Sequence, residues 1–271
     1  MKSIQMIHGC APSWRPHEQS LRNYVSEGSL KRHLVACREA YGPLSDFPAH
    51  DVLTIDDSTI GAARACLVAR EAGHAVTLFI NPAQIARRRL YWFSRLDAIL
   101  DARTVATVAF AGRDYELRPG RPLQSFRLAV KARLVALDEG DTDAMLDELA
   151  DRLGAGAAVL PEHARTMTLE CLRELVDRGV QIGSHGWDHR DITSLGPAEL
   201  VEDVRHAADW FQTCLGLVPR HYAVPYGLSF LPNYAAGEVS GMIMLANSEL
   251  KLGSLDSRHW NRRDITTELQ D

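Results

Sequence analysis

The sequence predicts an α/β protein in which parallel strands alternate with helices. Residues 50–82 have the pattern strand, helix, strand, and this helix supplies the long crossover that two parallel strands need. The same alternation resumes after residue 163. The chain has 271 residues, enough for one large α/β domain or two small ones. Barrels of alternating strands and helices commonly contain about 250 residues in a single domain.

The first third of the chain contains three strand-like segments and two helical ones. The second helix is expected to begin at Asp57 or Ser58, either of which can cap its first turn. It is expected to end at Gly73, because glycine commonly follows the last helical turn. The strands are expected at residues 3–7, 52–55 and 75–80, and apolar residues at helical spacing place the first helix at 29–41.

Residues 83–163 interrupt the alternation of strands and helices. We interpret them as an insertion in one domain that spans residues 1–271, because nothing in them resembles a flexible linker. The expected elements are an aromatic helix at 90–100, a hairpin of 105–110 against 115–117, and polar helices at 122–137 and 142–153.

The last third returns to alternating elements. A helix from Pro197 to Leu215 is well defined, with proline in its first turn and Gly216 just beyond its end. The other expected elements are a helix at 168–177 and strands at 180–183, 221–224 and 241–246.

Composition narrows the class of protein. The net charge of -5 and the lack of a dominant basic stripe argue against a nucleic-acid partner. No apolar stretch is long enough for a signal peptide at the start or for a transmembrane span later. The five cysteines are scattered and form no Cys-x-x-Cys pair, as is typical of reduced thiols. We therefore expect a cytoplasmic protein.

Two pairs of polar residues stand out because each follows a strand-like segment. Asp56 and Asp57 end one such segment, and His185 and His189 follow the strand expected at 180–183. Active sites of barrels form at strand ends of this kind. Each pair alone also has a structural explanation, the aspartates as a helix cap and the histidines as ordinary core or surface residues.

Together, the two pairs predict a catalytic metal site. One carboxylate and two imidazoles form a three-ligand set that leaves a position open for water. The other carboxylate is then free to act as a base. This donor set suits Zn²⁺ best, with Co²⁺, Ni²⁺, Mn²⁺ or Fe²⁺ as alternatives. The expected chemistry is metal-dependent hydrolysis.

A third segment, residues 222–227, reads Tyr-Ala-Val-Pro-Tyr-Gly. Its structural interpretation is a strand that ends in a Pro-Tyr-Gly turn. Its functional interpretation is a backbone N–H, that of Tyr226, which points into the cleft and helps to hold an oxyanion.

These three segments together resemble the polysaccharide deacetylase family, the NodB-homology carbohydrate esterases. The family's Thr-Phe-Asp-Asp motif corresponds to residues 54–57, its Gly-Ser-His-Thr/Ser-x-x-His motif to 183–189, and its third motif to 224–227. The resemblance covers most of the chain apart from 83–163 and the far C-terminus. It implies a distorted (β/α) barrel of seven to eight strands.

The resemblance also implies a role for each site residue. Asp56 would be the general base, Asp57, His185 and His189 the metal ligands, and the Tyr226 amide part of the oxyanion site. Contacts with the sugar are expected from Trp187, Pro225 and Tyr226.

The chain departs from the family pattern in two places. Ala223 stands where an arginine often orients the catalytic base, and the motif that supplies the catalytic acid is not evident after residue 230. A circularly permuted subgroup, similar to the poly-N-acetylglucosamine deacetylases, also lacks that arginine and begins with a segment ending in histidine. The chain begins with Gln5-Met6-Ile7-His8. We therefore expect His8 to be the general acid, with His259 as the competing candidate.

The function implied is removal of an N-acetyl (acyl) group from an amino sugar in a polysaccharide, an oligosaccharide or a glycan precursor. The partner is then a carbohydrate substrate, and the oligomeric state is left open. One alternative is a deformylase or deacylase of a lipid- or nucleotide-linked amino sugar. The other is a catalytically silent carbohydrate-binding protein with the same fold.

Overall fold

A computed structural model describes residues 2–118, 123–134, 137, 139–227, 243–247 and 259–270. The chain forms two compact units. Unit 1 consists of residues 1–14, 23–89 and 166–271, and unit 2 of residues 15–22 and 90–165. Residues 83–89, which the sequence placed in the insertion, are therefore part of unit 1.

Unit 1 is a barrel, as predicted. Seven parallel strands among the described residues close on themselves in the order β1-β11-β10-β9-β8-β5-β4, so that β1 pairs with both β11 and β4. One residue pair, Ser184 with Tyr222, joins β8 to β9, which makes this the weakest seam of the barrel. The strands are β1 (Ile4–Ile7), β4 (Val52–Asp56), β5 (Thr77–Ile80), β8 (Gln181–Ser184), β9 (His221–Ala223), β10 (Ile243–Asn247) and β11 (His259–Asp264).

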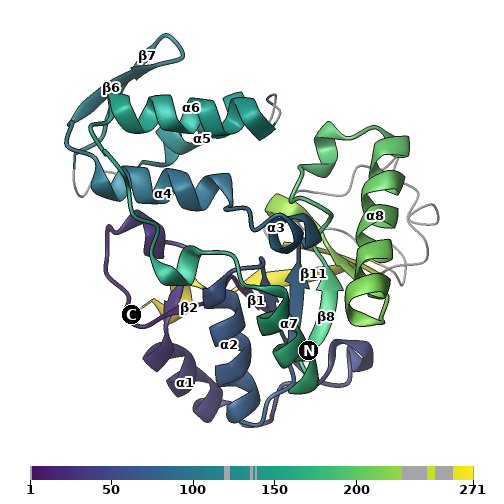
Figure 1. Ribbon diagram of the computed structural model, residues 1–271. Coiled ribbons are helices and arrows are strands. Elements are labelled where there is room, and N and C mark those ends of the chain that lie inside the picture. Colours follow the sequence, from purple (N-terminus) through teal and green to yellow (C-terminus); the bar gives the residue numbers. More distant parts are fainter. Residues whose placement is uncertain are drawn as a thin grey trace. The chain divides into compact units, whose positions relative to one another are not determined.

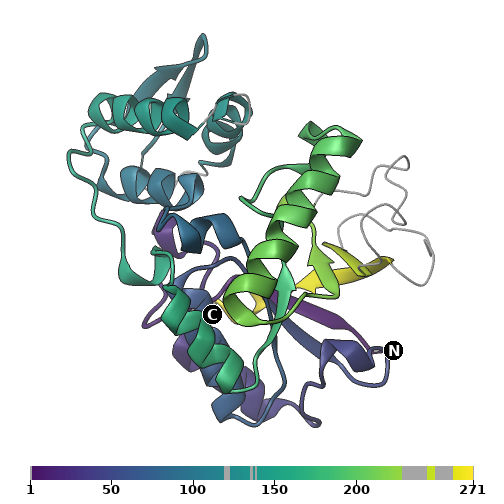
Figure 2. The same ribbon diagram turned by 45° about the vertical axis from the view of Figure 1, so that its right-hand side comes forward.

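Helices cover the outside of this barrel (Figures 1 and 2). The main apolar core of unit 1 lies between them and the strands, and α2 packs on α1 and α7. A short parallel pair, β2 (Cys10–Ala11) with β3 (Val25–Ser26), extends the region after β1. The helices are α1 (Glu27–Ala36), α2 (Ile60–Glu71), α3 (Pro82–Ala86), α7 (Leu169–Asp177) and α8 (Pro197–Leu215).

The start of α2 differs from the expectation. Thr59, and not Asp57 or Ser58, is the N-cap, because its side chain accepts a hydrogen bond from the Ala62 N–H at 3.1 Å. Thr59 has the extended backbone that an N-cap needs, whereas Asp57 has a left-handed φ of 76°. The Asp57 carboxylate therefore does not cap this helix.

Strand β11 was not expected from sequence. Its residues, His-Trp-Asn-Arg-Arg-Asp, are polar apart from Trp260 and lack the alternation or apolar run that indicates a strand. It pairs in parallel with β10 and β1, so partners distant in sequence determine its conformation.

Unit 2 has its own apolar core of helices and a hairpin. The expected hairpin is present as β6 (Thr107–Phe110) paired antiparallel with β7 (Arg113–Glu116). The helices are α4 (Trp92–Ala102), α5 (Gln124–Leu134) and α6 (Glu139–Arg152), and buried core residues include Leu96, Leu100, Phe126, Val130, Leu146 and Leu149. Across the parts of the chain that the structure describes, no helix is both long and apolar enough to span a membrane.

A buried histidine links the α1 region to the barrel in a way that depends on its charge. The Nδ1 atom of His74 accepts the Tyr41 backbone N–H at 3.0 Å, and its Nε2 atom lies 3.1 Å from the Leu34 carbonyl. This arrangement requires a neutral ring with its proton on Nε2. Burial lowers the pKa of His74 below its ordinary value.

We predict that His74→Gln reduces the dependence of stability on pH. The pKa of this histidine is lower in the folded state than in the unfolded state, where it is about 6.5. The neutral ring therefore stabilises the fold above about pH 6.5, and this stabilisation is lost as the pH falls toward the folded-state pKa. In that window the variant should have a slope of unfolding free energy smaller by up to about 1.4 kcal/mol per pH unit. Urea unfolding at a series of pH values measures the slope. The exposed His50, changed to Gln, is the control, and equal slopes in both variants would contradict the prediction.

Candidate metal centre

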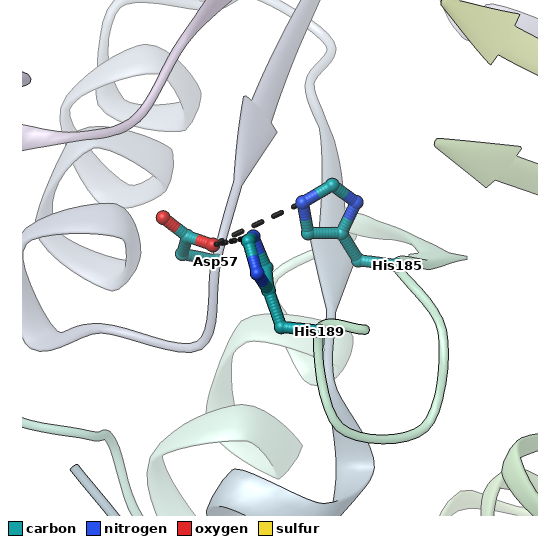
Figure 3. A group of neighbouring side chains, drawn as sticks. All are labelled: Asp57, His185 and His189. Atoms are coloured by element: carbon teal, nitrogen blue, oxygen red, sulfur yellow. Dashed lines mark ion pairs between the residues drawn. The ribbon is translucent and has the colours of Figure 1, made fainter. Parts of the chain in front are cut away.

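The three predicted metal ligands lie together at the carboxyl ends of two barrel strands. Asp57 follows β4, His185 follows β8, and His189 lies in the loop after β8 (Figure 3). The Asp57 Oδ1 atom is 3.5 Å from His189 Nε2 and 3.9 Å from His185 Nε2. One ligand atom from each residue lies within 4.8 Å of the others.

Both imidazoles are prepared to act as ligands. The His185 Nδ1–H donates to the Ala223 carbonyl at 2.8 Å, which orients the ring and leaves Nε2 toward Asp57. Burial lowers the pKa of His185 to about 4 and that of His189 well below its ordinary value. Both rings are therefore neutral at physiological pH, and their nitrogen lone pairs are available.

The donor set fits a divalent cation. A buried carboxylate with two neutral imidazoles carries one negative charge, which attracts a divalent cation. Oxygen and nitrogen donors of this kind are typical of catalytic zinc sites with three protein ligands. The residues that the sequence selected can thus hold a metal with no other side chain added.

Backbone strain is concentrated at this centre. Asp57, His189 and Tyr226 all have left-handed φ values, of 76°, 64° and 63°. Such a conformation costs about 1–3 kcal/mol for a residue other than glycine, and it tends to occur at functional sites.

Asp56 takes part in a buried ion pair. Arg262 on β11 binds it through two hydrogen bonds, from Nη1 to Oδ1 at 2.6 Å and from Nη2 to Oδ2 at 2.7 Å. The Arg262 side chain is completely buried, also lies within 3.3 Å of Thr54 Oγ1, and covers the Phe79 ring. This bidentate geometry holds the Asp56 carboxylate in one orientation.

Arg262 bears on the departure noted at Ala223. An arginine does bind Asp56 in this chain, but it lies on another strand, 206 residues after Asp56. Sequence reasoning missed it because β11 was not recognised, and the available signal was the pair Arg262–Arg263 in an unassigned segment.

The pKa of Asp56 results from two opposing effects. Burial acts to raise it, but the Arg262 guanidinium and, to a lesser extent, His185 lower it to about 2. Asp56 is consequently ionised over the whole physiological range.

His8, at the end of β1, lies within electrostatic reach of the same cluster. Burial and other charged groups have larger effects on the pKa values of Asp56, His185 and His189. The charge of His8 makes a smaller contribution that lowers all three pKa values. The next residue, Gly9, approaches α2 so closely that a methyl group there would lie 2.6 Å from the Gly61 carbonyl carbon. The side chain of the competing acid, His259, lies outside the described residues.

Among the expected sugar-contact residues, Tyr226 lies against His189. The Tyr226 ring meets the His189 ring edge to face at 4.6 Å, in a turn that includes Pro225. Trp187 stacks on His206 with ring centroids 3.9 Å apart, so one face of the indole is already covered. The oxyanion role of the Tyr226 N–H and the three sugar contacts stay predictions.

Comparison with known proteins agrees with the motifs. Residues 137–236 match a sequence family described as polysaccharide deacetylase. This segment includes both histidines and the Pro-Tyr-Gly turn, whereas Asp56 and Asp57 precede it.

Several solved structures share the fold of this chain. IcaB from Ammonifex degensii superposes with a TM-score of 0.59 and 13% identity, over 98% of this chain and 92% of that one. The Streptococcus pyogenes deacetylase PplD, solved with acetate, gives 0.60 and 13%, over 100% and 98%. A Bacillus cereus polysaccharide deacetylase gives 0.55 and 12%, over 97% and 64%. The predicted resemblance and the NodB-like fold are confirmed.

We predict that Arg262→Met strongly destabilises the protein, because it leaves the Asp56 carboxylate buried without its counter-ion. Removing one partner of a buried pair typically costs about 3–5 kcal/mol. Arg262→Met combined with Asp56→Asn should recover part of this loss, since the stranded charge is then removed. Urea unfolding of both single variants and the double variant measures the coupling.

The neighbouring Arg263 provides a matched control. It is exposed on the same strand and pairs with Glu268, so Arg263→Met should cost no more than about 1 kcal/mol. An Arg262→Met variant as stable as Arg263→Met would contradict the structural importance of the pair.

Proposed function

Since this chain is related to the polysaccharide deacetylases, we propose that it is a metal-dependent hydrolase that removes the N-acetyl group of an amino sugar. The substrate class is an acetylated polysaccharide, oligosaccharide or glycan precursor. The observation that carries the proposal is the convergence of Asp57, His185 and His189 next to an ionised, oriented Asp56. The predicted cytoplasmic location stays a prediction.

The metal would be held by Asp57, His185 and His189. When bound, a divalent ion such as Zn²⁺ supplies two effects, a lower pKa for a bound water and polarisation of the acyl carbonyl. The need for this acidification follows from Asp56, since a carboxylate with a pKa of about 2 is a weak base toward ordinary water.

The protein's own groups supply the remaining steps. Asp56 accepts a proton as the water oxygen attacks the acyl carbon, and Arg262 keeps the carboxylate aimed. The Tyr226 N–H donates to the developing oxyanion. His8, protonated, donates to the sugar nitrogen as the C–N bond breaks, so that acetate and a free amine leave.

The absence of an arginine at position 223 is one argument for the alternative of a catalytically silent carbohydrate-binding protein. The contact between Arg262 and Asp56 weakens this argument, because Asp56 has an arginine partner from another strand. The second alternative, a deformylase or deacylase of a lipid- or nucleotide-linked amino sugar, would use the same groups and differs in the acid released.

We predict that the purified protein releases acetate from N-acetylglucosamine oligosaccharides, and that chelation abolishes this release. Adding Zn²⁺ or Co²⁺ should restore it. Asp56→Asn should retain the metal but lower turnover by about 100- to 10,000-fold, because the proton acceptor is lost. Asp57→Ala should lose both metal and turnover.

Metal content by elemental analysis and enzymatic quantitation of acetate and formate are the measurements. Asp209→Asn, an exposed aspartate on α8, is the control. Release of formate in place of acetate would favour the deformylase. Glycan binding without release of either acid, in a metal-loaded protein, would contradict the proposal.

We predict that His8→Gln slows cleavage of the amide far more than that of an activated ester. A departing amine needs a proton, whereas 4-nitrophenolate leaves unprotonated. The variant should therefore lose about 100- to 10,000-fold on the acetylated sugar and less than about tenfold on 4-nitrophenyl acetate. His259→Gln is the companion variant. If His259→Gln loses amide cleavage selectively and His8→Gln does not, His259 and not His8 is the general acid.

A further inference from the structure

We propose that Asp203, a buried carboxylate on α8, is a positioning residue for the histidine loop, residues 185–189, and so sets how tightly this loop binds a metal. The inference depends on the proposed function only in requiring that the loop hold a cation. Asp203 is one of the polar residues that sequence reasoning did not select.

The direct contact is with the middle of the loop. The Trp187 N–H donates to Asp203 Oδ2 at 2.9 Å, and Trp187 lies midway between the two histidine ligands. The carbonyl of the same residue accepts the Ala83 N–H at 2.9 Å, at the start of α3. Both backbone polar groups of Trp187 are thus held, and Asp203 provides the side-chain half of this restraint.

The turn before Trp187 also packs against Asp203. Gly186 has a φ of 79°, and a methyl group on it would lie 3.2 Å from Asp203 Oδ2 and 3.1 Å from the Tyr222 hydroxyl. A side chain at Gly186 would therefore push directly on Asp203.

Asn81, after β5, restrains the other side of the loop. Its side-chain amide donates to the carbonyls of His185 and Gly186, the latter at 3.2 Å. Asn81 is itself fixed, since its N–H donates to Ser58 Oγ at 2.9 Å. The loop is held between a neutral amide on one side and a carboxylate on the other.

The charge of Asp203 indicates more than a packing role. The side chain is 9% exposed, and burial raises its pKa to about 6, with Trp187 lowering and Asp188 raising it less strongly. A neutral acceptor would avoid this desolvation. A carboxylate gives a stronger hydrogen bond to the loop, and its negative charge favours a cation held nearby.

Two substitutions separate the hydrogen bond from the charge. Asp203→Ala removes both, whereas Asp203→Asn keeps an acceptor oxygen for the Trp187 N–H and removes the charge. Asp209→Ala, on the exposed side of the same helix, is the matched control. Co²⁺ is the probe, because its visible absorption spectrum reports ligand geometry and chelator competition gives its dissociation constant.

We expect Asp203→Ala to bind Co²⁺ about 10- to 100-fold more weakly than the wild type, with an altered spectrum. Asp203→Asn should show a smaller loss of affinity, because it keeps an acceptor for the Trp187 N–H and removes only the charge. Asp209→Ala should match the wild type. The Asp203→Ala variant binding Co²⁺ with unchanged affinity and spectrum would overturn the inference.

Circular dichroism of the metal-free proteins checks folding. If Asp203→Ala does not fold, Asp203→Asn decides, and wild-type affinity and spectrum in that variant would overturn the inference. A wild-type protein that binds neither Co²⁺ nor Zn²⁺ would instead contradict the proposed function itself. The two failures are therefore distinguishable.

Discussion

The ion pair between Asp56 and Arg262 is the interaction on which the site depends. Two charged groups lie inside a barrel, where each alone would be very costly, and two short hydrogen bonds make them tolerable as a pair. The pair joins β4 to β11, which both flank β1 in the closed sheet. The orientation of the carboxylate therefore depends on how the strands are arranged. The carboxylate that we propose as the proton acceptor is thereby held by two barrel strands and not by a surface loop.

Adjacent aspartates acquire different environments through one change in backbone direction. Asp56 is the last residue of β4 and faces Arg262, whereas Asp57 has a left-handed φ and faces the histidines. The same strain recurs at His189 and Tyr226, and rigid contacts from neighbouring elements maintain it. The free energy stored in these turns is part of what the well-packed core of the barrel must offset.

Local patterns in the sequence were sufficient for most of the fold and for the three residues that we propose as metal ligands. Apolar runs, helix ends and the His-x-x-x-His spacing identified β4, β8 and α8, because short-range physics largely determines these elements. The sequence could not reveal β11 or Arg262, since a polar hexapeptide becomes a strand only when β1 and β10 are beside it. It also missed Asp203, whose partner is a backbone N–H that has no signature in the sequence.

The position of Arg262 on β11 also determines when the site can be completed during synthesis. Asp56 emerges from the ribosome 206 residues before the guanidinium that neutralises it. Chains emerge at about 5–20 residues per second, so the carboxylate has no such partner for roughly 10–40 seconds. Until β11 is synthesised, the chain lacks both the strand that completes the closed sheet and the buried counter-ion of Asp56.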